Sequence, residues 1–306
     1  MGSLYFHIAL VVANILFGAS FSVYVSLLHT SLSSQQLFAI QLVVSALIFI
    51  PAALTRRDFL RLTLEDFGSI FIVALLVIFG WWYMLLWGAS YTNPIDASTL
   101  STLGPIFTLI TAIIVQQRRA KLYETMGFVI ALLGAGVLLF SRGDAIIGDG
   151  GEGYGNALVL CAVVAIAINT VLISPVLRKY GTTVVMGWYY LIGVVLSLPI
   201  LIAELPTIAW RSFSIFERSE LCYIVLFGTA LPMYLLYKGS EHLSTIHTAL
   251  YRYLQPIVAT LLALIRKQSH LDQENLIGAT LIFLGVIFIV LTTRAESSPH
   301  HALRRR

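Results

Sequence analysis

The stretch ASTLSTLGPIFTLITAIIV, residues 97–115, has a counterpart in TALYRYLQPIVATLLALI, residues 248–265. A shift of 151 residues aligns the two stretches without a gap and places Pro105 on Pro256. The same shift pairs, again without gaps, Tyr83 with Tyr234, Leu85 with Leu236, Gly88 with Gly239, Ile95 with Ile246, Leu103 with Leu254, Gly127 with Gly278 and Gly134 with Gly285. Because glycines and prolines keep this register, the pattern indicates two copies of one unit.

The composition places both copies in a membrane. Charged residues make up 11% of the chain, against about 25% in an ordinary soluble domain. Residues of the AVILMFWYC set make up 58%, and the mean hydropathy is +0.88. Such a chain lacks the polar side chains that cover a soluble protein, so we expect an integral membrane protein. Cys161 and Cys222 lie in apolar runs, and we interpret both as small core residues rather than disulfide or metal partners.

Apolar runs long enough to span a bilayer recur along the whole chain, about 20 residues each. They predict ten helices, at 4–28, 34–54, 68–90, 96–117, 123–141, 155–176, 184–203, 220–242, 246–266 and 274–293. Each copy holds an odd number of spans, so the second copy enters the membrane upside down relative to the first. We therefore predict an all-α integral membrane protein of ten transmembrane helices in two inverted five-helix repeats, 4–141 and 155–293, followed by a basic cytoplasmic tail, 294–306.

Lysine and arginine predict the orientation, because they are enriched in cytoplasmic loops. With the N-terminus inside, 13 basic residues lie in inner loops and the tail, and 5 lie outside. The outer residues are Arg142, Arg211, Arg218, Arg266 and Lys267. Both termini are thus expected in the cytoplasm. The protein itself is expected in the cell membrane, that is, the cytoplasmic or inner membrane. The first apolar run has no positive region before it, so we interpret it as a retained span and not a cleaved signal peptide.

Inverted repeats place a binding site near the middle of the membrane, at the interface between the repeats. The predicted helices 96–117 and 246–266 each carry a stripe of small and polar residues. Ser98, Ser101, Thr102 and Tyr253 are candidate substrate-binding residues on these stripes. Close helix packing is the alternative explanation of the stripes. Pro105 and Pro256 are expected to bend their helices and to free carbonyl groups that line a cavity.

Arg252 is a single charge inside an apolar span, where insertion costs roughly 2.5–3.5 kcal/mol. One interpretation is structural: the side chain extends to the inner interface or caps carbonyl groups within the bundle. The other is functional: the guanidinium faces the central cavity and pairs with an anionic group of the cargo. Its planar fork suits a carboxylate or a phosphate. The sequence leaves both interpretations open.

Further candidates for the cavity wall lie in four other predicted helices: Asn14, Trp82, Tyr83, Asn169 and Tyr234. Each has packing between helices as its alternative role. No carboxylate lies deep in any predicted span, so coupling to an ion through a buried acid has no candidate. Gly148, Gly150 and Gly153 match G-x-G-x-x-G only by chance, since no strand precedes them. We predict no catalytic residues, no metal site and no cofactor.

Several of these stretches together resemble a known family. They are ANILFGASF (13–21), the two stretches quoted first, and the glycine pairs of the fifth and tenth predicted helices. The chain is similar in them to the EamA family of the drug/metabolite transporter superfamily. The resemblance implies export of small metabolites, often amino acids, through a central cavity. It implies lining roles for Asn14, Tyr83, Ser98, Thr102, Asn169, Tyr234 and Arg252, although an arginine at position 252 is not part of the general family pattern.

The expected function is that of a secondary transporter, an exporter of amino acids or related carboxylates that works by alternating access. Its partners are a small-molecule substrate and the lipid bilayer, with no nucleic acid and no obligate protein partner. The alternatives are a structural or regulatory membrane protein with a filled core, a passive channel, and a membrane enzyme acting on lipid. The enzyme would need a cluster of catalytic groups at one depth, and the sequence offers none.

Overall fold

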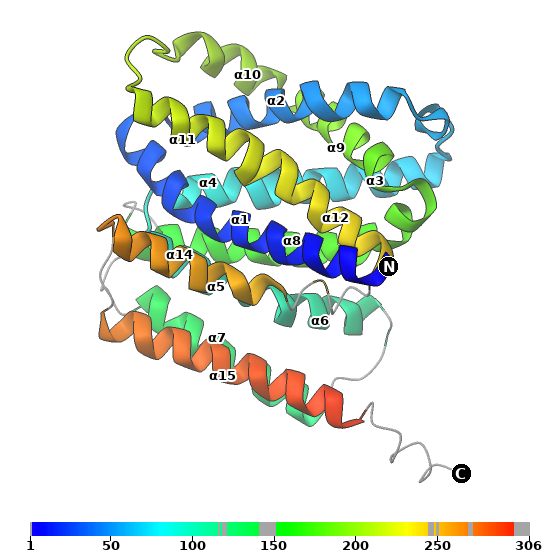
Figure 1. Cartoon of the computed structure of the whole chain (residues 1–306). Coiled ribbons are helices and arrows are strands. Elements are labelled where there is room, and N and C mark those ends of the chain that lie inside the picture. The colour runs from blue at the N-terminus through cyan, green and yellow to red at the C-terminus, as the bar shows by residue number, and fades with distance from the viewer. Residues whose placement is uncertain are drawn as a thin grey trace.

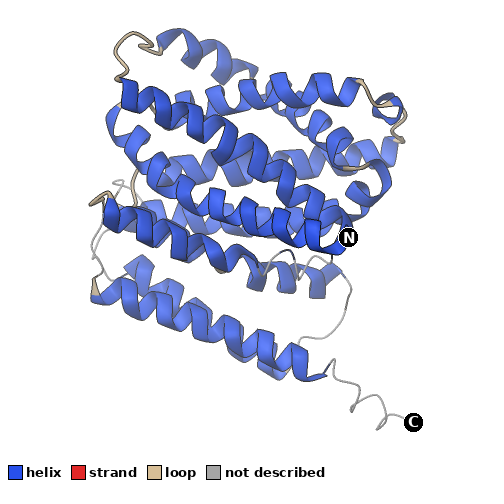
Figure 2. Cartoon of the chain, in the orientation of Figure 1, coloured by secondary structure: helices blue, strands red, loops and turns tan. Residues whose placement is uncertain are grey.

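A computed structural model describes residues 2–115, 117, 121–140, 151–243, 248, 251–268 and 272–296. Every regular element in these ranges is helical (Figure 2). Most of the expected tail, 297–306, lies outside the described residues, as do Gly148 and Gly150.

The first copy of the repeated unit folds into α1 (Gly2–Thr30), α2 (Ser34–Leu54), η1 (Arg57–Leu60), α3 (Leu64–Leu75), η2 (Leu76–Tyr83), α4 (Met84–Ala89), α5 (Pro94–Ser101), α6 (Gly104–Val115) and α7 (Leu122–Phe140). The second copy folds into α8 (Glu152–Tyr180), α9 (Thr182–Leu196), α10 (Leu198–Glu204), η3 (Leu205–Thr207), α11 (Ile215–Val225), η4 (Leu226–Ala230), α12 (Leu231–His242), η5 (Tyr251–Tyr253), α14 (Leu254–Ile265) and α15 (Gln273–Glu296).

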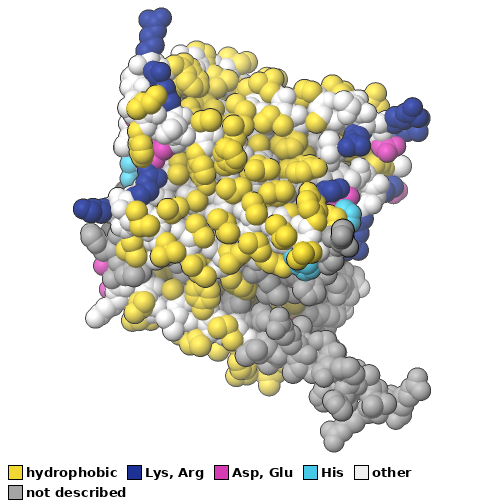
Figure 3. Space-filling model, viewed as in Figure 1, with side chains coloured by type: hydrophobic (Ala, Val, Ile, Leu, Met, Phe, Trp, Pro, Cys, Tyr) yellow, Lys and Arg dark blue, Asp and Glu magenta, His cyan; other side chains and the backbone are white. Residues whose placement is uncertain are grey.

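Many of these helices can cross a membrane. Among the described residues, 6 continuous helical segments are long and apolar enough, and the count is 7 if the bent pair α9–α10 forms one span. Two further apolar helices, Leu122–Leu138 and Tyr251–Ile265, are shorter. Apolar side chains cover the face seen in Figure 3, and Lys and Arg gather toward its left and right edges. The chain is therefore an all-helical, multi-pass membrane protein. The interpretation of Cys161 and Cys222 as core residues is wrong, because both are exposed on the surface of the bundle.

Capping side chains fix several helix starts. Ser33 and Ser214 each form a capping box at the starts of α2 and α11, with Gln36 and Glu217 respectively. Thr63 accepts a hydrogen bond from the backbone of Asp66 and begins α3. Since such caps satisfy the free N–H groups of the first turn, α3 and α11 begin at Leu64 and Ile215, earlier than the apolar runs alone predict.

The spans are interrupted at several points. The prediction of one helix over 184–203 is wrong, because the axis bends by 66° at Ser197, between α9 and α10. Pro199 follows directly and lacks the N–H that would continue the helix. Another span breaks between α5 and α6, just before Pro105. Two spans contain π-helical segments, η2 and η4, at corresponding places in the two copies.

The two copies pack against each other throughout the described bundle. α1 contacts α12 and α14, α8 contacts α4 and α6, and α2 contacts α9. α7 and α15 lie side by side at one edge of the molecule (Figure 1). Their backbones approach so closely that a Cβ on Gly134 would lie 2.7 Å from the Gly278 carbonyl oxygen, and one on Gly285 would lie 2.4 Å from that of Gly127. Glycine is needed at these contacts because any larger side chain would meet backbone atoms.

Candidate functional site

Arg252 lies in η5, where a short 3-10 turn precedes α14 and Pro256. Its side chain is buried, with 4% of the residue exposed. Gly104 provides the room: a Cβ there would lie 3.3 Å from Arg252 Cδ and 3.5 Å from Nη1. The guanidinium lies 6.0 Å from the centre of the Trp81 ring, within the range of a cation–π interaction. Among the described residues, no carboxylate forms an ion pair with Arg252.

A small aromatic chamber adjoins this arginine. Seven residues line it: Phe17, Phe21, Tyr24, Trp81, Trp82, Leu85 and Gln255. Its volume is about 10 Å³, so the ring side chains fill it almost completely in this conformation. Trp81 both lines the chamber and faces the guanidinium, so Arg252 lies behind the Trp81 ring and does not itself line the chamber. We refer to these seven residues as the chamber.

Two amides connect the chamber to α1. Gln255 Nε2 donates a hydrogen bond of 2.7 Å to Asn14 Oδ1, and Asn14 Nδ2 donates one of 2.7 Å to the Leu10 carbonyl. A Cβ on Gly18 would lie 2.7 Å from the carbonyl oxygen of Gln255, so α1 and α14 touch backbone to backbone here. Asn14 is one of the residues predicted from the sequence to line the cavity, whereas Gln255 is not. The available signal was its position three residues after Arg252, on the same helix face.

Asn169 makes hydrogen bonds between four spans. Its Nδ2 donates to the Val73 carbonyl and to the Tyr189 hydroxyl, both at 2.9 Å. Its Oδ1 accepts a hydrogen bond of 3.1 Å from the Tyr237 hydroxyl. Asn169 therefore has a clear packing role in this conformation.

The remaining candidates from the sequence lie near the chamber's helices but do not line it. Three buried hydroxyls donate to carbonyls of their own helix at 2.6–2.9 Å: those of Ser98, Ser101 and Thr102. Tyr83 packs edge-on against Phe38 at 5.3 Å, and Tyr234 lies 6.2 Å from Phe49. The Tyr253 hydroxyl is buried without a hydrogen-bond partner. Trp82 alone of the aromatic candidates faces the chamber.

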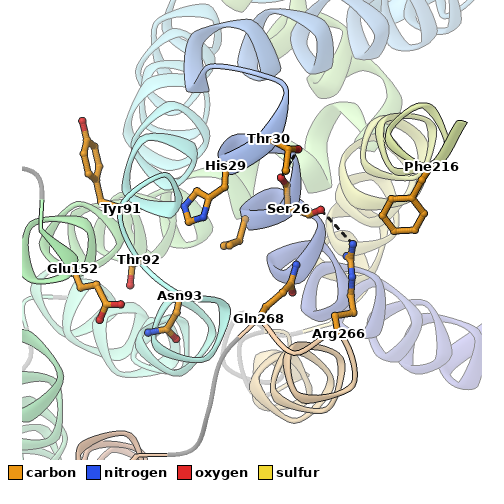
Figure 4. Close-up of a pocket in the computed structure, with 11 residues that line it drawn as sticks. Ser26, His29, Thr30, Tyr91, Thr92, Asn93, Glu152, Phe216, Arg266 and Gln268 are labelled. Carbon is orange, nitrogen blue, oxygen red and sulfur yellow. Dashed lines mark hydrogen bonds between the residues drawn. The ribbon is translucent and has the colours of Figure 1, made fainter. Parts of the chain in front are cut away.

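A larger cavity, of about 660 Å³, lies at the end of the bundle opposite the N-terminus. We call it the outer vestibule, after the orientation predicted from the sequence; its walls are Val25, Ser26, His29, Thr30, Tyr91, Thr92, Asn93, Glu152, Phe216, Arg266 and Gln268. Figure 4 shows residues from the end of α1 facing those of the loop before α5 and of the end of α14. Most of these side chains are polar, so the vestibule is suited to a water-soluble molecule.

An ion pair flanks the outer vestibule. Arg266 contacts the carboxylate of Glu220, and its two terminal nitrogens donate to Ser22 and Ser26 at 3.3 Å. Ser26 also donates to Glu220 at 2.9 Å. Glu220 is 5% exposed and lies in the second turn of α11, near one end of its span and not deep within it. It comes inside the helix because α11 begins at Ile215, before the predicted start at 220.

Direct contacts join described helices at the end of the bundle near the N-terminus. His7 Nδ1 and the Tyr251 hydroxyl form a hydrogen bond of 2.6 Å, and Phe6 stacks on His242 at 3.9 Å. Lys238 forms an ion pair with Glu241, three residues further along α12, at 3.0 Å. The contacts of His7 and Phe6 join the start of α1 to η5 and to the end of α12.

These features define a multi-pass helical membrane protein with a polar vestibule at one end and, near a small aromatic chamber, a buried arginine that pairs with no described carboxylate. In the described part of the chain, no group of three or more His, Cys, Asp or Glu residues could hold a metal ion. The sequence profile described as the EamA-like transporter family matches residues 4–140 and again 153–291. The chain therefore belongs to the EamA-like transporter family of the drug/metabolite transporter superfamily.

Curated relatives carry transporter names. "Uncharacterized transporter YetK" of Bacillus subtilis is 21% identical over 257 residues, which cover 83% of this chain and 74% of that protein. An "Uncharacterized transporter" of Clostridium kluyveri is 24% identical, over 82% of each chain. A solved crystal structure of a protein that is 20% identical covers 97% of this chain, with a TM-score of 0.64, and shares the fold. This chain is accordingly a membrane transporter by family, and its curated relatives are named as transporters rather than enzymes.

Proposed function

We propose that the protein is a secondary transporter that exports small metabolites bearing a carboxylate, such as amino acids, by alternating access to the chamber. Arg252 carries this proposal. It is buried inside a span, and no described carboxylate compensates its charge. A buried cation is stable only when it is paired. The carboxylate of the cargo supplies that partner, and the arginine fork binds it through two parallel hydrogen bonds.

Reciprocal contacts support the arrangement as two inverted repeats, 4–141 and 155–293. Gly134 meets Gly278, and Gly285 meets Gly127. The shift of 151 residues converts each contact into the other, as a two-fold relation between the copies requires. α7 and α15 must run in opposite directions for both contacts to form. The matching π-helical segments η2 and η4 support the same relation.

Four further segments, added to the 6 helical spans, bring the proposed total to ten. α7, α15, the η5–α14 segment and the bent pair α9–α10 each occupy the place of one predicted helix. With ten spans, both termini lie on one side of the membrane. The described basic residues on that side include Arg56, Arg57, Arg61, Lys121, Arg178, Lys179 and Lys238. This bias supports cytoplasmic termini, and the family resemblance supports outward transport.

The two ends of the bundle support alternating access. The vestibule is open at one end, while the contacts of His7 and Phe6 join helices at the other. This combination fits a conformation that faces outward, with the chamber closed around its aromatic side chains. Trp82 already lines the chamber, and Asn14 accepts a hydrogen bond from Gln255 in the chamber wall. We propose that the other candidates reach the cargo when the chamber opens: Tyr83, Ser98, Ser101, Thr102, Asn169, Tyr234 and Tyr253.

Transport into proteoliposomes tests the proposal. The purified protein is reconstituted, and uptake of radiolabelled amino acids is compared with uptake of the matching amines that lack the carboxylate. We expect saturable uptake of the acids and little uptake of the amines. Uptake of amine and acid at equal rates, or no uptake of any carboxylate tested, contradicts the proposal.

A further inference from the structure

Three buried polar atoms near the chamber face tyrosine hydroxyls but make no hydrogen bond of normal geometry in the described structure. They are Gln41 Nε2 and Ser45 Oγ on α2, and Thr229 Oγ1 in η4. Gln41 is 1% exposed, and Ser45 and Thr229 are 0% exposed. Buried polar groups in proteins are nearly always hydrogen-bonded, because an unpaired group loses its bonds to water without replacement. Three such atoms near one another therefore indicate a place where a partner binds.

The three groups surround Tyr24, a residue of the chamber. Tyr24 faces both Thr229 and Gln41. Ser45 lies one turn from Gln41 on the same face of α2 and faces Tyr190. The Tyr190 ring lies 6.0 Å from Trp82, which also lines the chamber. We call Tyr24, Gln41, Ser45, Tyr190 and Thr229 the Tyr24 cluster.

Arg252 and the Tyr24 cluster border the same chamber through different residues. The guanidinium faces Trp81, whereas the cluster reaches the chamber through Tyr24 and Trp82. Phe17 and Phe21 on α1 also line the chamber. The chamber thus has one cationic boundary and one neutral polar boundary, with aromatic rings between them.

The chemistry of the cluster selects the kind of group that it can bind. It consists of one amide and four hydroxyls, which donate and accept hydrogen bonds and carry no charge. A charged group would find no counter-charge within the cluster, and burying it there would be costly. A hydroxyl or an amide can both donate and accept, and therefore matches the cluster.

The backbone conformation at Thr229 also indicates a functional site in the Tyr24 cluster. Thr229 lies in the π-helical segment Leu226–Ala230. π-helical turns are rare and occur frequently at functional sites, because they change the direction of side chains within a span. The corresponding residue of the first copy is Ile78, so the polar group is present in only one copy.

We propose that the Tyr24 cluster recognises an uncharged hydroxyl or amide group of the cargo whose carboxylate pairs with Arg252. This inference rests on the proposed function and narrows its substrate class. The preferred cargo is then an amino acid or hydroxy acid with a second, uncharged polar group. Apolar amino acids of the same size are poorer substrates.

Threonine and valine provide the test, since they have nearly the same shape and differ in one hydroxyl. Uptake of each is measured with the wild-type protein and with Thr229→Val and Gln41→Leu in proteoliposomes. We expect the wild type to favour threonine by roughly tenfold, the effect of one hydrogen bond to a buried group. Both variants should lose the preference and transport the two amino acids at similar rates.

Ser240→Ala is the matched control. It removes a buried hydroxyl whose hydrogen bond of 2.8 Å to the Leu236 carbonyl stays within α12. This variant should keep the preference for threonine. Thermal unfolding of the cluster variants completes the design, because losing an unpaired buried polar atom should leave the melting temperature equal or higher.

The outcomes separate this inference from the proposed function. Equal transport of threonine and valine by the wild type overturns the role of the Tyr24 cluster and leaves carboxylate transport intact. Variants with an unchanged preference and a raised melting temperature also overturn it, since the polar atoms then affect stability alone. Failure to transport any carboxylate contradicts the proposed function itself.

Discussion

Replacing Arg252 by methionine should weaken transport without weakening the fold. Methionine keeps the length of the aliphatic stem and removes the charge. Removing one partner of a buried, hydrogen-bonded charge pair costs about 2–5 kcal/mol. Since 1.4 kcal/mol corresponds to a factor of about ten, the half-saturating concentration of the cargo should rise by at least about 30-fold. Uptake of a radiolabelled carboxylate into proteoliposomes measures this directly.

The stability of the same variant should move in the other direction. Without cargo, Arg252 faces the Trp81 ring at 6.0 Å and the Tyr237 side chain, and it forms no ion pair with a described carboxylate. The interaction with the ring is worth about 0.5–2 kcal/mol, less than the cost of burying an unpaired charge. We therefore expect Arg252→Met to unfold in detergent at the same temperature as the wild type or at a higher one.

Arg266 is the matched control, because it lies at the end of the same helix and is paired with Glu220. Arg266→Met leaves the Glu220 carboxylate buried without its cation. Breaking a buried ion pair lowers the free energy of unfolding by about 3–5 kcal/mol, and we expect the lower end of that range because Arg266 is partly exposed. Its unfolding temperature should fall. If Arg252→Met also lowers the unfolding temperature while leaving carboxylate uptake unchanged, Arg252 is a structural residue and the reasoning is refuted.

Two further predictions concern packing and orientation. Gly134→Ala should destabilise the protein by about 1–3 kcal/mol, because its Cβ would lie 2.7 Å from the Gly278 carbonyl oxygen. Gly136→Ala meets no atom within 4 Å, and an equal loss of melting temperature in both variants would contradict the α7–α15 contact. A cysteine at Ser212, in a background without native cysteines, should react with an impermeant thiol reagent outside intact cells. One at Arg57 should react only after permeabilisation, and the reverse pattern refutes the orientation.

The sequence predicts the spans well where one physical effect dominates. Apolar runs locate the membrane helices, since about 20 apolar residues are needed to cross the bilayer. The spacing of Lys238 and Glu241 on one helix face predicts their ion pair, which is confirmed at 3.0 Å. The resemblance in the repeated stretches predicts the family, which the matches over 4–140 and 153–291 confirm.

The sequence fails where two effects compete or where distant residues meet. The continuous apolar run over 184–203 predicts one helix, whereas Pro199 is the single residue in it that indicates the break at Ser197. Glu220 is buried because it pairs with Arg266, far along the chain, and no local pattern reveals this. The Tyr24 cluster combines α1, α2, η4 and α9, so its unpaired atoms become apparent only in the assembled bundle.

Paired spin labels test alternating access most directly. One pair, at Tyr91 and Phe216, spans the outer vestibule, and the other, at Leu4 and Arg178, spans the opposite end; all four residues are exposed. Cys161 and Cys222 are first replaced by serine. Distances between the labels are then measured by double electron–electron resonance in lipid, with and without a transported carboxylate. The account predicts opposite changes, with one pair moving apart as the other closes. Distances that stay fixed at both ends, or that widen together while cargo is transported, would contradict it.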